Sequence, residues 1–241
     1  MQVPDEYYQK YKNIDPASGF GIDKRPFPKM TENDKEDARK VYAMVNNIDD
    51  NVGKLLKKLD DLKISDNTLV IFMTDNGPQQ IRYVAGMRGR KGDVYQGGVR
   101  VPFYIKYPSV FKKNKDIESM ATHIDILPTL AQLCNVEMPK DRKIDGKSLL
   151  PLIMGKKVDW AERSLFSYWT RAYAELYNNI ALRKGSYKLV GKTNYNASIK
   201  DFELFNLDKD PYEQNNVISE NITIAKNLNS LSHLEQMAGC I

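Results

Sequence analysis

The sequence predicts an α/β fold in two parts. Over residues 1–157 we expect a mixed, mainly parallel sheet flanked by helices, and over residues 158–241 a small antiparallel sheet with a terminal helix. The first expectation rests on a long amphipathic segment followed by a short, continuous apolar run, which is typical of helix–strand alternation. The second rests on short alternating runs separated by turn residues, which favour antiparallel strands.

A long helix is predicted from Thr31 to Leu62. Thr31 is a candidate N-cap, and Glu32 and Asp34 place negative charge in the first turn, where the helix dipole favours it. Apolar residues then recur at three- and four-residue steps and so share one face: Val41, Met44, Val45, Ile48, Val52, Leu55, Leu56 and Leu59.

Two short apolar runs, residues 68–73 and 101–108, predict strands, and the first reads as buried on both faces. The turn TDNGP at residues 74–78 follows the first strand directly. Ligands of open α/β sheets bind just beyond the carboxyl ends of strands, so this turn is well placed for chemistry. Residues 79–100, between the two strands, are rich in glycine, arginine and lysine.

The later elements follow from the same rules. Residues 122–133 predict an apolar helix with Pro128 in its first turn, where a missing N–H is tolerated. Gly185 and Ser186 predict a hairpin turn. Strands are expected at residues 164–168, 180–183, 187–190 and 203–207, and residues 221–237 have helical spacing.

Composition excludes several classes of partner. The net charge of +5 is spread along the chain, whereas a nucleic-acid binder usually concentrates its basic residues on one element. No run of about 18 apolar residues exists, so we expect no membrane span. Cys134 and Cys240 are too far apart to form a metal motif or a disulfide framework. The polar N-terminus is no signal peptide, so any signal would lie upstream.

Asp75 and Asn76 offer adjacent hard oxygen ligands at a strand end, which suit Ca²⁺ or Mg²⁺ better than Zn²⁺. Asp-Asn-Gly is also a common turn sequence, and taken alone the tripeptide favours that interpretation. Residues 87–102 change the balance, because their glycines allow close approach to a ligand and their cations can bind an oxyanion. The alternative is a solvated basic loop. A metal site followed by an oxyanion clamp is what hydrolysis of a sulfate or phosphate ester requires.

The motifs TDNGP, RGRKG and QGGVRVPFYIKYP, in this order and spacing, resemble the sulfatase family of the alkaline phosphatase superfamily, and its arylsulfatase-like members in particular. Further similar stretches are YAMVNNIDDNVG, HIDILPTL, IDGKSLLPLI, GSYKLV and ELFNLDKDPYEQNNV. The resemblance covers residues 35–220 and implies the C-terminal part of a sulfatase-type fold. It implies a periplasmic, secreted or lysosomal location.

The resemblance assigns roles to matching positions. Asp75 and Asn76 match the family's second pair of Ca²⁺ ligands, and Lys91 matches the lysine that contacts the sulfate of the substrate. Arg88 and Arg100 flank Lys91, and we interpret Arg100 as structural. The family's usual glutamate before the paired glycines is replaced by a glutamine at position 96, which we expect to shape the loop.

Two family features are absent from the sequence. No cysteine or serine lies in the C/S-x-P-x-R motif that becomes the formylglycine nucleophile. The first Asp-Asp ligand pair has no counterpart, because Asp49-Asp50 and Asp60-Asp61 fall in the predicted helix. We therefore expect the isolated chain to be inactive, to bind Ca²⁺ weakly or not at all, and to self-associate or bind the missing N-terminal half of the protein.

The expected activity of the intact protein is hydrolysis of sulfate esters, with sulfated carbohydrates among the candidate substrates. A phosphodiesterase or phosphonate ester hydrolase of the same superfamily is an alternative. Asn76 argues against a two-zinc phosphatase, in which histidine follows the aspartate, but not against a phosphonate ester hydrolase. A non-catalytic structural fragment is the third alternative.

Overall fold

The computed structural model describes residues 1–18, 26, 29–158, 160, 163–171, 173 and 175–239. The chain divides into two compact units, Met1–Lys54 with Met73–Phe103 and Glu162–Ile241, and Leu55–Phe72 with Tyr104–Ala161. The α/β class predicted from the sequence is confirmed, since helices accompany two separate sheets. The predicted domain division at residue 158 stays a prediction.

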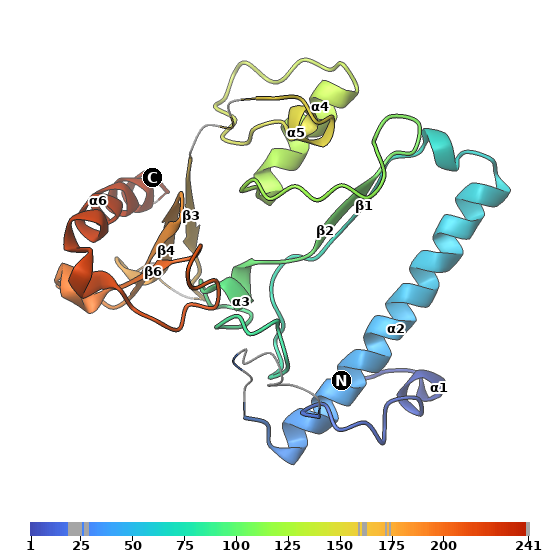
Figure 1. Ribbon diagram of the computed structural model, residues 1–241, viewed down its shortest axis with the longest axis horizontal. Coiled ribbons are helices and arrows are strands. Elements are labelled where there is room, and N and C mark those ends of the chain that lie inside the picture. The colour runs from blue at the N-terminus through green and yellow to red at the C-terminus, as the bar shows by residue number, and fades with distance from the viewer. Residues whose placement is uncertain are drawn as a thin grey trace. The chain divides into compact units, whose positions relative to one another are not determined.

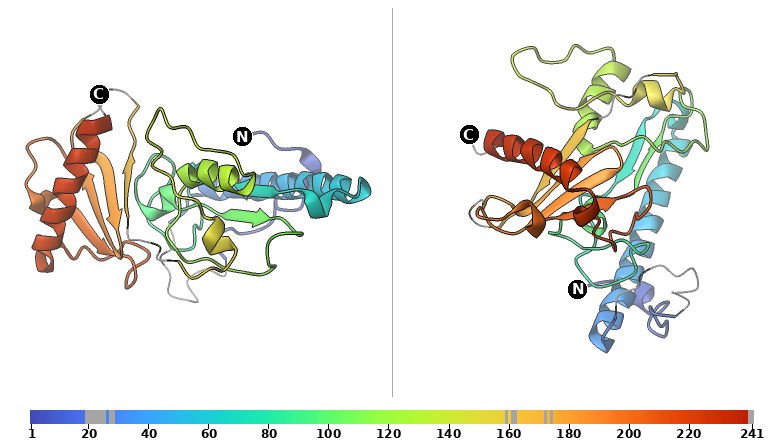
Figure 2. Two further views of the ribbon diagram at one scale, coloured as in Figure 1. Left: turned by 90° about the horizontal axis from the view of Figure 1, so that it is seen from above. Right: turned by 60° about the vertical axis from the view of Figure 1, so that its left-hand side comes forward.

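The C-terminal sheet is antiparallel, as predicted, with the order β3 (Ser164–Tyr168), β4 (Asn178–Lys184), β5 (Tyr187–Lys192) and β6 (Glu203–Asn206). Helix α6 (Ile222–Gly239) lies across one face of this sheet (Figures 1 and 2). The β4–β5 hairpin turns at Gly185, whose φ of 55° favours glycine. The apolar residues between sheet and helix are Ile180, Leu182, Leu189, Phe202, Leu204, Ile218, Ala225 and Leu228.

The opposite face of the sheet carries a second cluster. Ala181, Val190 and Phe205 alternate with the residues that face α6 and pack against Val94 and Tyr95 of the glycine-rich loop. Side chains of a strand point alternately to its two faces, so the register that buries one cluster also fixes the other. This arrangement seats the candidate functional loop, with its short helix α3 (Gln96–Val99), on a rigid sheet.

Helix α2 (Glu32–Asp61) matches the predicted helix closely. Thr31 caps it, because its Oγ accepts the Asp34 N–H at 3.2 Å while Asp34 accepts the Thr31 N–H at 2.8 Å. The short α1 (Asp5–Tyr8) is joined to α2 by the Tyr8 hydroxyl, which donates to the Glu36 carboxylate at 2.8 Å.

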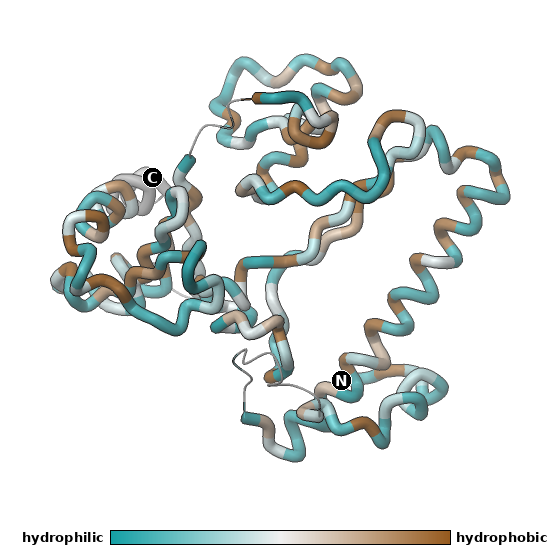
Figure 3. Tube along the Cα trace, in the orientation of Figure 1, coloured by the Kyte–Doolittle hydropathy of each residue, from teal (hydrophilic) through white to brown (hydrophobic). Residues whose placement is uncertain are grey.

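The apolar face of α2 is only partly covered. Val41 is 8% exposed, whereas Val45, Ile48 and Leu55 are 53%, 48% and 58% exposed. Figure 3 shows apolar positions recurring along α2. The spacing correctly predicted one apolar face, but the partner that such a face normally requires is not among the described residues.

The second unit contains most of the strands β1 (Val70–Met73) and β2 (Phe103–Lys106), all but Met73 and Phe103, and the two strands form a two-stranded sheet. Its core is the cluster Phe111, Leu149 and Ile153, with α4 (Ile126–Leu133) and α5 (Leu150–Ile153) around it. The expectation that the first strand is buried on both faces is wrong, because Phe72 is 38% exposed. In the described part of the chain β1 pairs with β2 alone, so it lacks the neighbours of a central strand.

Short 3₁₀ turns, Ser65–Asn67, His123–Asp125, Ile199–Asp201 and Ile218–Glu220, connect these elements. The segment His123–Asp125 leads directly into α4, so Pro128 falls in the first turn of that helix as predicted. Within the described ranges, no helix has the length and apolar character needed to cross a bilayer.

Candidate active site

The turn after β1 presents the two predicted metal ligands. Asp75 is exposed and its Oδ1 accepts the Asn76 N–H at 2.9 Å. The half-buried Asn76 donates its side-chain amide N–H to the Gly77 carbonyl at 2.8 Å, so its amide oxygen is not used by this bond. The turn thereby orders two hard oxygen donors side by side.

This turn is bonded directly to the glycine-rich loop. The Gly77 N–H donates to the Gly98 carbonyl at 2.8 Å, and the Lys91 N–H donates to the Pro78 carbonyl at 2.9 Å. The contact is so close that a Cβ on Gly77 would lie 1.7 Å from the Gly97 carbonyl oxygen. Only glycine fits there. The structure therefore places all three predicted site residues, Asp75, Asn76 and Lys91, on one bonded segment of backbone.

The loop is internally ordered. The Gly97 N–H donates to the Arg88 carbonyl at 2.6 Å, and Gly89 and Gly92 have φ angles of +88° and +86°. The Asp93 carboxylate accepts the Arg90 N–H at 3.1 Å and also forms an ion pair with Lys192 of β5. The loop is therefore both basic and held in one conformation by these contacts.

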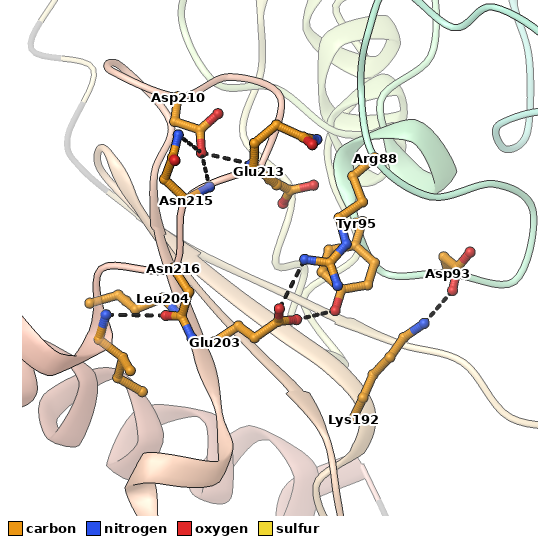
Figure 4. A network of polar contacts seen from close by, with 12 residues as sticks. Arg88, Asp93, Tyr95, Lys192, Glu203, Leu204, Asp210, Glu213, Asn215 and Asn216 are labelled. Atoms are coloured by element: carbon orange, nitrogen blue, oxygen red, sulfur yellow. Dashed lines mark hydrogen bonds and ion pairs between the residues drawn. The ribbon is translucent and has the colours of Figure 1, made fainter. Parts of the chain in front are cut away.

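Arg88 ties the loop to the C-terminal sheet, as Figure 4 shows. Its guanidinium lies 4.1 Å from the centroid of the Tyr95 ring and 2.9 Å from the Glu203 carboxylate. The Tyr95 hydroxyl also donates to Glu203. Burial, together with this hydrogen bond, raises the pKa of Tyr95. Both side chains are engaged by these contacts, and through them Arg88 positions the loop on the sheet.

A buried ion pair lies beneath the loop. Lys188 and Glu213, 3% and 0% exposed, approach to 2.7 Å, and the second Glu213 oxygen accepts the Gln96 N–H at 2.6 Å. Burial raises the pKa of Glu213 and lowers that of Lys188. Gln96 is itself 5% exposed, and its backbone is what the glutamate holds. The loop is thus anchored by a charge buried under its short helix.

Sequence reasoning missed this anchor. Lys188 lies two residues before Val190 on β5 and so belongs to the same inward face, where an unpaired charge is costly. That placement was a readable signal for a buried partner. The partner is Glu213, whose backbone has a φ of 58°. Nothing in the local sequence predicts that Glu213 is this partner.

Lys91 and Arg100 are both exposed. In the described part of the chain neither Lys91 nor Asp75 has an ion-pair partner. No described side chain would therefore compete with an anion for Lys91 or with a cation for Asp75. The described residues contain no group of three or more histidines, cysteines, aspartates or glutamates that could hold a metal. Asp75 and Asn76 fit a hard cation by donor type but supply only two of the about six to eight oxygens that Ca²⁺ prefers.

Comparison with known proteins identifies the family. The sulfatase family profile matches residues 1–136, and the profile of the N-sulphoglucosamine sulphohydrolase C-terminal region matches residues 90–237. The chain belongs to the sulfatase family. The resemblance stated from its motifs is therefore confirmed.

Curated sulfatases are similar over much of this chain. The ulvan-active sulfatase of Formosa agariphila is 30% identical over 217 residues, which are 88% of this chain and 40% of that protein. The N-acetylgalactosamine-6-O-sulfatase of Bacteroides thetaiotaomicron is 28% identical over 76% of this chain and 39% of its own length. Rat steryl-sulfatase is 34% identical over 54% of this chain and 24% of its own. The chain spans less than half the length of these relatives.

Solved structures share the fold. Ps i-CgsB, which has also been solved with k-i-k-neocarrahexaose, superposes with a TM-score of 0.75 at 23% identity, over 98% of this chain and 47% of that one. The phosphonate monoester hydrolase of Agrobacterium radiobacter superposes with a TM-score of 0.65 at 22% identity, over 88% and 43% of the two chains. At these identities the likeness shows the fold alone.

Proposed function

We propose that this chain supplies one half of the active site of a sulfuric-ester hydrolase. The observation that carries the proposal is the backbone bonding between the 74–78 turn and the glycine-rich loop, which joins Asp75 and Asn76 to Lys91. Family membership supports the reaction class. The oxygens of the exposed Asp75 and the half-buried Asn76 suit a divalent cation, and such a cation together with the exposed Lys91 would suit a ligand that carries dense negative charge.

Each residue has a distinct role in this proposal. Asp75 and Asn76 would hold a divalent cation, Ca²⁺ by donor type, which when bound would neutralise the charge of the sulfate group. The Lys91 ammonium would donate hydrogen bonds to the sulfate oxygens. The Glu213 anchor and the Arg88–Glu203 pair keep the loop rigid, so the lysine is held in place before the substrate arrives.

The nucleophile and the remaining metal ligands would come from residues outside this chain. No C/S-x-P-x-R motif occurs in the 241 residues, and we propose that the isolated chain is inactive. The exposed apolar residues of α2 support a partner segment of the same protein, because such a stripe is costly to leave in water.

Sulfated glycans are the proposed substrates. Relatives similar over most of this chain include an N-acetylgalactosamine-6-O-sulfatase, whose name states a sugar, and an ulvan-active sulfatase. The exposed loop carrying Lys91 is compatible with a bulky, polar substrate that approaches from solvent.

Three variants in the intact enzyme test the assigned roles. Asp75→Ala should abolish both Ca²⁺ binding and activity, because it removes a charged ligand. Asn76→Ala removes a neutral ligand and should weaken metal binding less. Lys91→Ala should lower turnover by about a hundredfold or more, the usual scale for one oxyanion donor, while the metal content is retained. Kinetics and metal analysis are measured on the same preparations.

Lys113→Ala is the matched control, because Lys113 is an exposed lysine outside the loop. It should leave both turnover and metal content unchanged. Near-normal activity in Asp75→Ala, or metal loss in Lys91→Ala, would contradict the assignment.

A further inference from the structure

A pocket of about 360 Å³ adjoins the proposed sulfate loop. The residues that line it include Pro78, Gln80, Arg82, Arg88, Arg90 and Asp93. Pro78 accepts the Lys91 N–H at 2.9 Å, and Arg90 immediately precedes Lys91. Two lining residues of the pocket, Pro78 and Arg90, therefore adjoin Lys91 directly, and the whole pocket belongs to the same compact unit as Lys91.

Two of the four charged side chains that line this pocket form ion pairs. Arg88 is paired with Glu203 at 2.9 Å. Asp93 accepts the Arg90 N–H and is paired with Lys192, so its negative charge is balanced. Among the described residues, these contacts leave two guanidinium groups of the pocket, those of Arg82 and Arg90, without an ion-pair partner.

Arg82 differs from Arg90 in its burial, because Arg90 is exposed to solvent. The Arg82 side chain is half-buried, and no carboxylate in the described part of the chain forms an ion pair with it. The titratable group that acts on its pKa is the Tyr42 hydroxyl, which is neutral under ordinary conditions. Burial lowers the pKa of the Arg82 guanidinium, although arginine remains protonated under ordinary conditions. A partly buried cation without a counter-ion is unfavourable unless an anion occupies the pocket.

We propose that this pocket is a subsite for a second anionic group of the substrate, bound by Arg82. The inference rests on the proposed function, because the ester at Lys91 sets the position of the rest of the substrate. The guanidinium binds sulfate and carboxylate oxygens in a planar, bidentate manner, so a second sulfate or a uronic-acid carboxylate on the same glycan fits its chemistry. The preferred substrate is therefore an oligosaccharide with at least two anionic groups.

The test compares substrates of one sugar skeleton: a singly sulfated disaccharide, the same disaccharide with a second sulfate, and one with a carboxylate in its place. In the intact enzyme, Arg82→Gln should lower the kcat/KM ratio of the doubly charged to the singly charged substrate by about tenfold, mainly through KM. Arg82→Lys keeps the charge and should restore part of that ratio. The two doubly charged substrates separate the sulfate from the carboxylate source.

Arg142→Gln serves as the control, because Arg142 is exposed, lies in the other compact unit and is paired with Asp141. It should leave the substrate ratio unchanged. An unchanged ratio in Arg82→Gln, with or without an equal loss of activity on both substrates, would overturn the inference. Sulfate release by the unmodified enzyme would in that case still support the proposed function.

Direct binding separates this inference from the proposed function. Calorimetry on the 241-residue chain should show that the doubly sulfated disaccharide binds more weakly to Arg82→Gln than to the unmodified chain. If no sulfate ester is hydrolysed but this difference remains, the pocket stands and the proposed function fails. If the two proteins bind the disaccharide equally, the pocket assignment is wrong.

Discussion

Breaking the buried Lys188–Glu213 pair should strongly destabilise the first compact unit. Lys188→Met leaves the Glu213 carboxylate at 0% exposure with the Gln96 N–H as its remaining polar contact. Removing one partner of a buried pair leaves an uncompensated charge, which typically costs about 3–5 kcal/mol. Because burial already raises the pKa of Glu213, part of this cost would be relieved by uptake of a proton.

A double variant isolates the cost of the unpaired charge. Lys188→Met with Glu213→Gln removes both charges and keeps an acceptor for the Gln96 N–H. The remaining loss is then the difference between a charged and a neutral hydrogen bond, about 1 kcal/mol. The double variant should therefore be more stable than Lys188→Met by about 2 kcal/mol or more.

Urea unfolding followed by circular dichroism measures these differences in the free energy of unfolding. The control is Lys140→Met, which breaks the exposed Lys140–Glu137 pair, 84% exposed on both sides, and should cause no measurable change. The claim that the pair anchors the loop would be refuted if Lys188→Met were as stable as the control. It would also be refuted if the double variant were less stable than Lys188→Met.

Three further outcomes are expected. Gly77→Ala should reduce sulfate release by the intact enzyme at least about a hundredfold, because the added Cβ would separate the turn from the loop, and full activity would contradict the close contact. The Tyr8 hydroxyl lowers the pKa of Glu36, so the contribution of this carboxylate to stability is present above its unfolded pKa and is lost as pH falls through its folded pKa. The protection factors of residues 5–11 against hydrogen exchange should therefore fall below about pH 4, and Glu36→Gln should remove this pH dependence. Val45→Lys with Ile48→Lys should reduce self-association of the isolated chain in sedimentation, and a compact monomer of the unmodified chain at all concentrations would count against the exposed face as an interface.

Local sequence rules predicted the elements that depend on local chemistry. The Thr31 cap, the extent of α2, the hairpin at Gly185 and the four C-terminal strands all follow from periodicity and turn residues, and each is present. The position of Asp75 directly beyond β1 follows in the same way, since the apolar run ends where the turn begins.

Contacts between distant segments were beyond those rules. Arg88 was recognised as a cation that flanks Lys91, but its partner Glu203 lies 115 residues away on β6. Glu213 and Lys188 meet only because β5 and the following loop are packed together. Periodicity fixes which face of a strand or helix is apolar, whereas the partner of that face depends on topology, so the exposure of α2 and β1 could not be predicted either.

Sulfate release is the most direct test of the central claim. Ion chromatography should measure free sulfate after incubation of a sulfated disaccharide with the 241-residue chain, and with an intact enzyme that joins this chain to a segment carrying the C/S-x-P-x-R motif. We expect no release above background from the chain alone, and release from the intact enzyme that stops on removal of Ca²⁺. Robust turnover by the pure chain, lost in Asp75→Ala, would contradict this account, as would an intact enzyme that cleaves phosphonate or phosphate esters and leaves sulfate esters untouched.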